Sequence, residues 1–189
     1  IGEVLAVKLQ GPRRNRLEVI IMCGIVGIVS ASDVSERLVD GLRRLEYRGY
    51  DSAGVAVIGA EGAIQRRRAQ GKIANLQREL DAAPAAGACG IAHTRWATHG
   101  KPSEANAHPH QSRSVAIVHN GIIENFQELR RELEGRGHVF ESQTDSEVIA
   151  HLITDGLDGG LDMTAAFAAA LGRLRGAYAI AAVNEAEPG

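Results

Sequence analysis

The chain has 189 residues, of which 44% are hydrophobic and 23% are charged, so its length and composition suit one globular domain with a sizeable core. Its formal net charge is −2, and no apolar run is long enough to span a bilayer, which argues against nucleic-acid and membrane partners. Its two cysteines, Cys23 and Cys89, do not make a disulfide framework, so we expect a cytoplasmic protein.

The first 22 residues differ in character from the rest of the chain. A turn-prone basic patch, Gly11-Pro12-Arg13-Arg14-Asn15-Arg16, separates two short apolar runs and is too short to favour a nucleic-acid site. We interpret residues 1–22 as a leader or a mis-assigned N-terminal extension, because Met22 offers a natural start. A cleaved propeptide and a tag remnant are the alternatives.

A thiol stands directly after Met22, and a run of mainly branched apolar residues follows it from Gly24 to Val29. This run predicts a buried strand. Removal of Met22 would leave Cys23 with a free α-amino group, so that one residue carries both a nucleophile and a base. The thiolate is the reactive form of cysteine, and an α-amino group with a pKa of about 7.7–8.0 can accept the thiol proton. The alternative is that Cys23 is an ordinary buried cysteine of the core.

Helices and strands mix along the remaining chain. Apolar residues at helical spacing predict helices at 34–48, 72–80, 124–136, 145–157 and 164–174, and short branched runs predict strands at 53–59, around 64, and at 89–94, 115–119 and 178–183. Residues 95–114 form a long polar loop, which inside a compact domain is usually functional. Because strands and helices do not alternate strictly, we predict a layered α+β fold with mostly antiparallel strands.

Three polar segments supply what the attack of a thiol on an amide needs. Arg95 opens the long loop and can grip a carboxylate through two parallel hydrogen bonds, while Thr98 and His99 add short-range donors. His119-Asn120-Gly121 is predicted to end a strand in a tight turn, where the Asn120 amide and the adjacent backbone N–H can form an oxyanion hole. Asp145 is predicted at a helix start, where its carboxylate can hold an ammonium group.

Each of these segments has a plain structural alternative. Arg95 could form a surface ion pair, Asn120-Gly121 a hairpin turn, and Asp145 an acidic residue in the first turn of a helix. Together with Cys23, however, the three segments describe a pocket for an α-amino acid that bears an amide.

The seven histidines do not predict a metal site. His93 and His99 are too far apart in the sequence for adjacent helical turns, and His108 and His110 flank a proline. We therefore expect no metal ligand among them.

These motifs together resemble the glutaminase domain of the isomerizing glutamine–fructose-6-phosphate aminotransferases, or glucosamine-6-phosphate synthases. That domain belongs to the N-terminal-nucleophile class of glutamine amidotransferases. The matching segments are 23–27 (CGIVG), 42–54 (LRRLEYRGYDSAG), 92–100 (AHTRWATHG), 106–110 (NAHPH), 119–125 (HNGIIEN) and 144–149 (TDSEVI). They occur in the family order over nearly all of residues 23–189. The sequence of residues 45–50 (LEYRGY) separates this family from the related amidophosphoribosyltransferases, which carry a different segment there.

The resemblance implies a four-layer αββα sandwich of the N-terminal-nucleophile hydrolase type. It implies that Cys23 attacks the glutamine carboxamide with its own α-amine as base, and that Asn120 and the Gly121 N–H stabilise the oxyanion. It implies no metal and no organic cofactor.

The resemblance also implies how the substrate L-glutamine is held. Arg95, Thr98 and His99 would bind its α-carboxylate, and Gly121 and Asp145 would bind its α-ammonium group. The loop from Arg95 to about residue 103 would close over bound glutamine, and Trp96 would gate the passage of ammonia to a synthase domain.

Two features depart from the family pattern. Residues precede Cys23, and a peptide-bonded Cys23 nitrogen is not a base. The chain also stops inside the glutaminase domain, so we expect residues 23–189 to be a C-terminally truncated form of that domain. The isomerase-type domains that bind fructose 6-phosphate are absent, and the full-length enzyme is expected to be a homo-oligomer.

Two other functions stay open. One is another N-terminal-nucleophile enzyme, such as an amidophosphoribosyltransferase or an unrelated amidohydrolase. The other is an inactive fragment whose nucleophile is capped by the leader and that at most binds glutamine.

Overall fold

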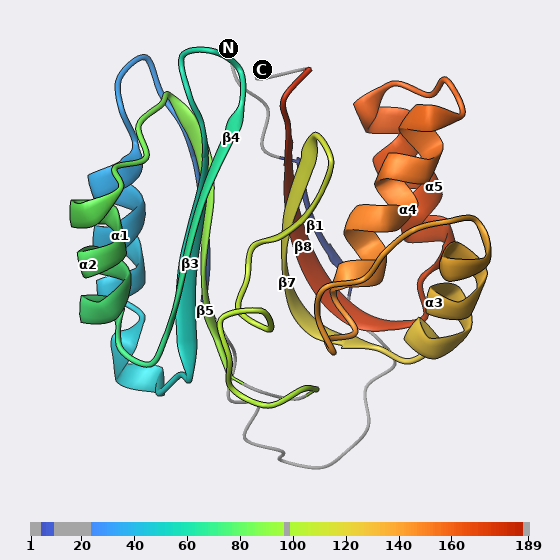
Figure 1. The fold of residues 1–189 in the computed structure, drawn as a ribbon, viewed down its shortest axis with the longest axis horizontal. Helices are drawn as coiled ribbons and strands as arrows, with labels where there is room; N and C mark the ends of the chain where they lie inside the picture. The colour runs from blue at the N-terminus through green and yellow to red at the C-terminus, as the bar shows by residue number, and fades with distance from the viewer. Residues whose placement is uncertain (1–4, 10–23, 97–98, 187–189) are drawn as a thin grey trace.

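The computed structural model describes residues 5–9, 24–96 and 99–186, which form four layers (Figure 1). Two helices cover one sheet, this sheet faces a second sheet, and three helices cover the outer face of the second sheet. Within the described residues every strand pairing is antiparallel. The predicted α+β fold with an αββα layering is confirmed.

The first sheet has the strand order β2-β5-β3-β4. Its strands are β2 (Gly24–Val29), β5 (Cys89–Arg95), β3 (Ser52–Ile58) and β4 (Ile64–Gln70). Its outer face is covered by α1 (Ser35–Arg43) and α2 (Ile73–Ala82), and a short 3₁₀ helix, η1 (Glu46–Arg48), follows α1. Leu38 and Leu42, one helical turn apart, are fully buried with Leu76 of α2 against this sheet. The apolar residues that predicted these helices therefore form the helix faces that pack against the first sheet.

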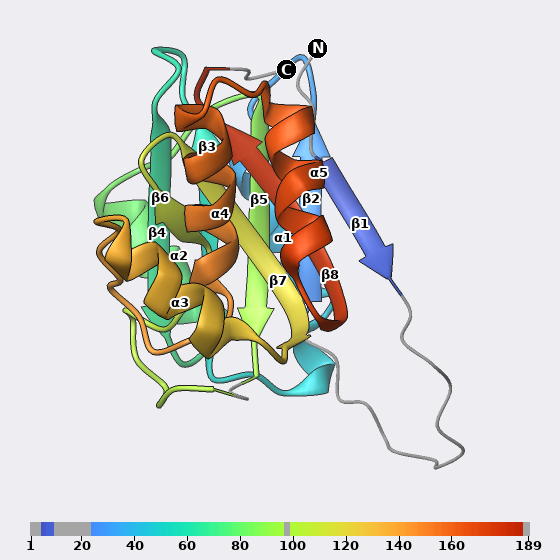
Figure 2. The same ribbon diagram turned by 90° about the vertical axis from the view of Figure 1, so that its right-hand side faces the viewer.

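The second sheet has the strand order β1-β8-β7-β6. Its strands are β1 (Leu5–Leu9), β8 (Gly176–Asn184), β7 (Val115–Ile123) and β6 (His110–Ser112). Figure 2 shows α3 (Phe126–Gly135), α4 (Glu147–Asp158) and α5 (Met163–Arg173) in front of this sheet. Strand β1 comes from within residues 1–22, so part of that stretch pairs with β8.

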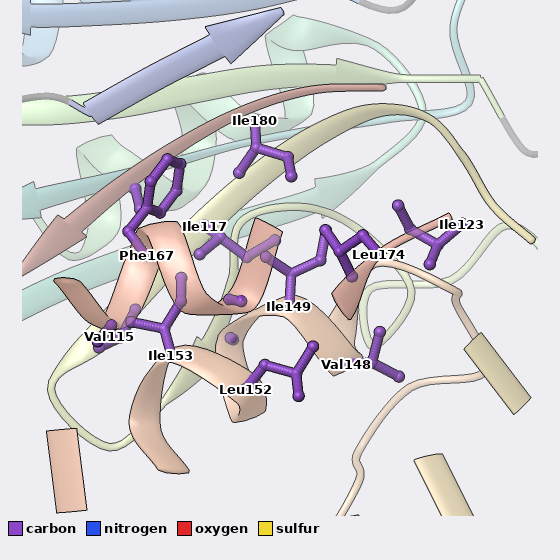
Figure 3. Close-up of a cluster of buried hydrophobic side chains, with 14 of the residues drawn as sticks. Val115, Ile117, Ile123, Val148, Ile149, Leu152, Ile153, Phe167, Leu174 and Ile180 are labelled. Atoms are coloured by element: carbon purple, nitrogen blue, oxygen red, sulfur yellow. The ribbon is translucent and has the colours of Figure 1, made fainter. Parts of the chain in front are cut away.

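Two kinds of core hold the layers together. Under the outer helices, large side chains of the sheet, α4 and α5 form one apolar cluster, in which Figure 3 shows Ile117, Ile149, Ile153 and Phe167. Between the sheets the buried residues are smaller, and Ala56, Cys89, Ile91, Ala116, Val118, Ala181 and Val183 are among them. Small inner residues let the two sheets approach closely.

The helices in the described part of the chain are short. The longest of them, α4, has 12 residues, and none is long and apolar enough to cross a bilayer.

The structure corrects the predicted turn at Asn120-Gly121. Strand β7 continues through both residues to Ile123, and they pair with Ala179 and Tyr178 of β8. The polar residues of the segment suggested a strand end, but backbone pairing with β8 extends the strand. The oxyanion-hole candidates therefore lie on a rigid strand and not in a turn.

Other boundaries shift by a few residues. Helix α4 begins at Glu147 with Ser146 as its N-cap, so Asp145 precedes the helix. The helix predicted at 34–48 divides into α1 and η1, and the long polar loop contains the short strand β6. None of these shifts changes the layer order.

Gly54 lies at a close approach between β3 and the polar loop. A Cβ atom there would lie 2.2 Å from the His108 carbonyl oxygen and 2.8 Å from that of Arg67. Backbone atoms on both sides leave no room for a methyl group.

We expect Gly54→Ala to lower the free energy of unfolding by about 1–3 kcal/mol, the usual cost of overpacking. The control is Gly172→Ala in α5, where nothing lies within 4 Å of the added Cβ. That helical substitution should raise stability by up to about 1 kcal/mol. Urea unfolding of both variants measures the difference, and an unchanged midpoint for Gly54→Ala would contradict the close approach.

Candidate active site

Polar ends of β5 and β7 meet at one end of the interface between the sheets. Inner-face residues of β5 are apolar up to Ile91, and alternation along the strand places His93 and Arg95 on the same face. On β7, Val118 belongs to the inter-sheet core, and Asn120 follows it on that face. The Nε2 atom of His93 lies 2.7 Å from Oδ1 of Asn120, so a hydrogen bond joins the two sheets here.

The described part of β2 begins beside these residues. Gly24 pairs with Thr94 of β5, and its N–H donates to the Thr94 hydroxyl at 3.1 Å. A Cβ at Gly24 would lie 2.5 Å from a methyl carbon of Leu45, so a larger residue there would require the Leu45 side chain to move. Cys23, the predicted nucleophile, precedes Gly24 directly, but Cys23 and Thr98 lie outside the described residues.

Arg95 is almost fully buried and organises the loop that follows it. Its guanidinium lies 3.5 Å from a carboxylate oxygen of Asp51 and donates to the backbone carbonyls of His99 and Gly100. The carbonyl oxygen of Arg95 in turn accepts from the Asp51 N–H at 2.8 Å. The alternative interpretation of Arg95 as part of a surface ion pair is therefore wrong, because the side chain is 5% exposed and bends the loop back onto β5.

Asp145 links the end of β7 to the start of α4. One carboxylate oxygen accepts from the Ile123 N–H at 2.8 Å, and the other lies 3.8 Å from Nδ1 of His99. The His99 ring meets the edge of Phe126 at a centroid distance of 5.2 Å. A buried carboxylate and an adjacent imidazole from the polar loop thus come together.

These contacts connect four of the predicted site residues, Arg95, His99, Asn120 and Asp145, in one ring. His93 and Ile123 complete it, because β5 leads from His93 to Arg95 and β7 leads from Ile123 back to Asn120. The sequence separations are large, and only the face-to-face packing of the sheets brings these residues together.

Gly121 and Trp96 lie at the edge of this ring. Gly121 has a φ of 130°, and a Cβ there would lie 2.2 Å from the Ala177 carbonyl oxygen, so the position requires glycine. Trp96 is 43% exposed, and its ring lies so close to Gly49 that an added Cβ would be 2.7 Å away. Gly49, in the matching segment 42–54, therefore leaves the space that the Trp96 ring occupies.

Sequence analysis missed a cluster of buried histidines behind Asn120. The ring of His108 lies 4.2 Å from that of His93, 4.6 Å from that of His110 and 6.4 Å from that of His119. Burial lowers the pKa of His93 and His110 to about 3 and of His119 to about 4, and it lowers the pKa of His108 well below its ordinary value. The sequence signal was the density of histidines in the matched segments, but their spacing alone could not show that they stack.

Glu147 holds the loop before α4. Its carboxylate accepts from the N–H groups of Glu141 and Ser142 at 2.8 Å and 2.7 Å and from the Ser142 hydroxyl at 2.6 Å. Burial opposes the charged form, but hydrogen bonds involving His151, Ser142 and Glu141 outweigh it and lower the pKa of Glu147 to about 2. This buried charge fixes the segment from which Asp145 projects.

In the described part of the chain no group of three or more histidine, cysteine or acidic side chains could hold a metal ion. The histidines instead bond to hydroxyl and amide groups, such as His110 Nε2 to Thr144 Oγ1 at 3.0 Å and His119 Nδ1 to Ser146 Oγ at 2.8 Å.

Comparison with known proteins gives the chain a family. The family profile described as "Glutamine amidotransferase domain" matches residues 93–188, slightly more than half of the chain.

Several curated relatives named "Glutamine--fructose-6-phosphate aminotransferase [isomerizing]" are similar to the chain. One from Rhizobium meliloti (strain 1021) is 60% identical over 167 residues, which cover 88% of this chain and 27% of the relative. One from Gluconobacter oxydans is 59% identical over 162 residues, covering 86% and 27%, and one from Pseudomonas putida is 56% identical over 168 residues, covering 88% and 28%. The chain therefore spans about a quarter of the length of these relatives.

Two solved structures share the fold. A glutamine phosphoribosylpyrophosphate amidotransferase from B. subtilis, complexed with ADP and GMP, superposes with a TM-score of 0.72 at 29% identity, covering 87% of this chain and 35% of that chain. A structure titled as the allosteric regulatory enzyme of purine biosynthesis gives 0.74 at 28% identity with the same coverage. Both support the N-terminal-nucleophile amidotransferase fold.

The buried histidines make stability depend on pH. Their pKa values are lower in the folded than in the unfolded chain, where the ordinary value is about 6.5, so the unfolded state binds more protons below that pH. We expect the free energy of unfolding to fall as pH drops from 6.5 to 4.5, by up to about 1.4 kcal/mol per pH unit for each of the four histidines. Urea unfolding over this range tests it, and a flat profile would contradict neutral buried histidines.

Proposed function

This chain belongs to the glutamine amidotransferase domain family, and we propose that it hydrolyses L-glutamine to glutamate and ammonia with Cys23 as the nucleophile. The single observation that carries this proposal is the ring of contacts that links Asn120, His99 and the buried Asp145 beside the start of β2. The amide of Asn120, the imidazole of His99 and the buried carboxylate of Asp145 come from three separate segments of the chain. Together they could bind the polar groups of an amino acid that has an amide side chain.

The reaction would begin with the attack of Cys23 Sγ on the carbon of the side-chain amide. The thiol proton passes to the α-amine of Cys23 and then to the leaving nitrogen, so the C–N bond breaks and ammonia departs. Water next hydrolyses the thioester and releases glutamate. Asn120 Nδ2 and the Gly121 N–H would stabilise the oxyanion formed in both steps, and their place on β7 keeps them rigid.

The ends of glutamine would be held by the charged groups of the ring. Asp145, which is 3% exposed, suits the α-ammonium group together with Gly121. Arg95, Thr98 and His99 are proposed to bind the α-carboxylate. Since Arg95 also bonds the carbonyls of His99 and Gly100, it would act both on the substrate and on the shape of the loop.

In a longer protein, we propose that the ammonia is used to make glucosamine 6-phosphate from fructose 6-phosphate. The support is the name shared by relatives up to 60% identical, of which this chain matches only about a quarter. Binding of fructose 6-phosphate would belong to the rest of that protein, with Trp96 gating the passage of ammonia. We place the whole enzyme in the cytoplasm as a homo-oligomer, without a nucleic-acid or membrane partner.

An amidophosphoribosyltransferase is the second candidate. It is favoured by the fold shared with a solved phosphoribosylpyrophosphate amidotransferase, but the identity of that structure to this chain is 29%, against up to 60% for the aminotransferase relatives. The aminotransferase is therefore the better proposal.

Asn120→Ala tests the proposed chemistry. An oxyanion donor acts mainly in the transition state, so kcat should fall by about 10²–10³ while KM for glutamine changes little. The control is Asn125→Ala, which removes an amide bonded to the backbone of Arg173 and Arg175 and should change stability but not kcat. Glutamate release measures both, and a rise in KM alone would make Asn120 a ground-state binding residue.

A comparison of two chains with different N-termini tests the proposal that the α-amine of Cys23 acts as the base. A chain that begins at Cys23 should hydrolyse glutamine, and a chain that begins at Ile1 should be slower by about 10²–10⁴, because a peptide-bonded nitrogen cannot act as base. Intact mass verifies each N-terminus, and thermal unfolding checks the loss of β1. Equal turnover with residues 1–22 still attached would show that the Cys23 amine is not the base.

A further inference from the structure

We propose that His93 is a positioning residue for the glutaminase reaction: its Nε2–H donates to Oδ1 of Asn120 and so fixes the orientation of the amide that stabilises the oxyanion. This inference rests on the proposed function, and it assigns a positioning role to one member of the buried histidine cluster. His93 itself need not touch glutamine.

The contact joins two rigid elements. His93 is fully buried on β5, Asn120 lies on the facing strand β7, and Nε2 and Oδ1 are 2.7 Å apart. An Asn side chain can rotate about two bonds and exchange the places of its oxygen and nitrogen. A hydrogen bond from a fixed donor to Oδ1 selects one of these orientations, and because the amide is planar it also fixes the direction of Nδ2.

The surrounding contacts show which nitrogen of His93 carries the proton. Nδ1 of His108 accepts from the backbone N–H of His119 at 3.4 Å, so it presents a lone pair. Nε2 of His93 lies 3.3 Å from that same atom and 2.7 Å from the oxygen of Asn120. Both neighbours of Nε2 are acceptors, so we assign the proton to Nε2, which donates it to the nearer acceptor, Oδ1 of Asn120.

The other nitrogen agrees with this assignment. Nδ1 of His93 is buried and has no hydrogen-bond partner among the described residues. A proton there would be a buried N–H without an acceptor, which is rarer and more costly than an unpaired acceptor. Burial also lowers the pKa of His93 to about 3, so the ring stays neutral at pH 7 and keeps a single N–H.

The reversed amide would conflict with the same network. If Nδ2 of Asn120 faced His93, Nε2 would need to be an unprotonated acceptor. Its lone pair would then face that of His108 Nδ1 at 3.3 Å, and in this buried site no solvent would weaken the repulsion between them.

Two substitutions of His93 separate positioning from packing. His93→Leu removes the donor, and kcat for glutamine hydrolysis should fall by about 10²-fold, the cost of a misplaced catalytic group, with little change in KM. His93→Gln places an amide N–H near the position of Nε2 and should recover most of that kcat. The control is Thr154→Val in α4, which removes a buried hydroxyl that donates to the backbone carbonyls of Ser112 and Ala150, away from Asn120. It should lower stability and keep kcat.

A spectroscopic measurement tests the proton directly. Nitrogen-15 NMR of the chain with labelled histidine distinguishes a protonated from an unprotonated ring nitrogen, and comparison with His93→Gln identifies the His93 signals. We expect a protonated Nε2 and an unprotonated Nδ1, unchanged between pH 6 and 8.

The outcomes are distinct. A protonated Nδ1, or equal kcat for His93→Leu and wild type, would overturn the positioning role even if the chain hydrolyses glutamine. Equal loss in His93→Leu and His93→Gln, both folded, would also overturn it. No glutamine hydrolysis by the wild-type chain that begins at Cys23 would instead overturn the proposed function, and the positioning role with it.

Discussion

The close packing of two antiparallel sheets is the constraint on which the rest of this structure depends. The inner faces carry small and branched residues, such as Ala56, Ala116 and Val118, and these permit a thin, dry interface. Apolar residues fill its middle, and the polar groups of the proposed active site lie at one end. The proposed active site occupies the end where β5 and β7 carry His93, Arg95 and Asn120 in place of apolar residues.

Burial of so many polar groups is tolerated because the charged ones have partners and each buried histidine of the cluster bonds through at least one ring nitrogen. The carboxylates of Asp145 and Glu147 accept backbone N–H groups, and the guanidinium of Arg95 donates to backbone carbonyls. The histidines avoid the cost of a buried charge by staying neutral. The partners are mostly main-chain atoms of loops, so the same bonds that compensate burial also hold those loops in one shape.

A rigid strand is a suitable place for the proposed oxyanion donors. Preorganised donors stabilise a transition state without having to reorient during the reaction. Asn120 and Gly121 are held by pairing with β8 on one side and by the His93 contact from the facing sheet. Arg95 and Asp145 tie the neighbouring loops to the same sheets, so the proposed substrate groups share one frame.

The sequence by itself determined much of this protein, and the limit of what it determined is physical. Local apolar spacing predicted the helices and most strands, since those patterns depend on near neighbours, and the motifs around Arg95, Asn120 and Asp145 predicted the chemistry. Local patterns could not show that Asn120-Gly121 continues β7, because pairing with β8, more than 50 residues later, decides it. They also could not show that His93 meets Asn120, or that Arg95 is buried against Asp51. Such contacts join segments far apart in the chain, and only the tertiary packing of the two sheets sets which of them meet.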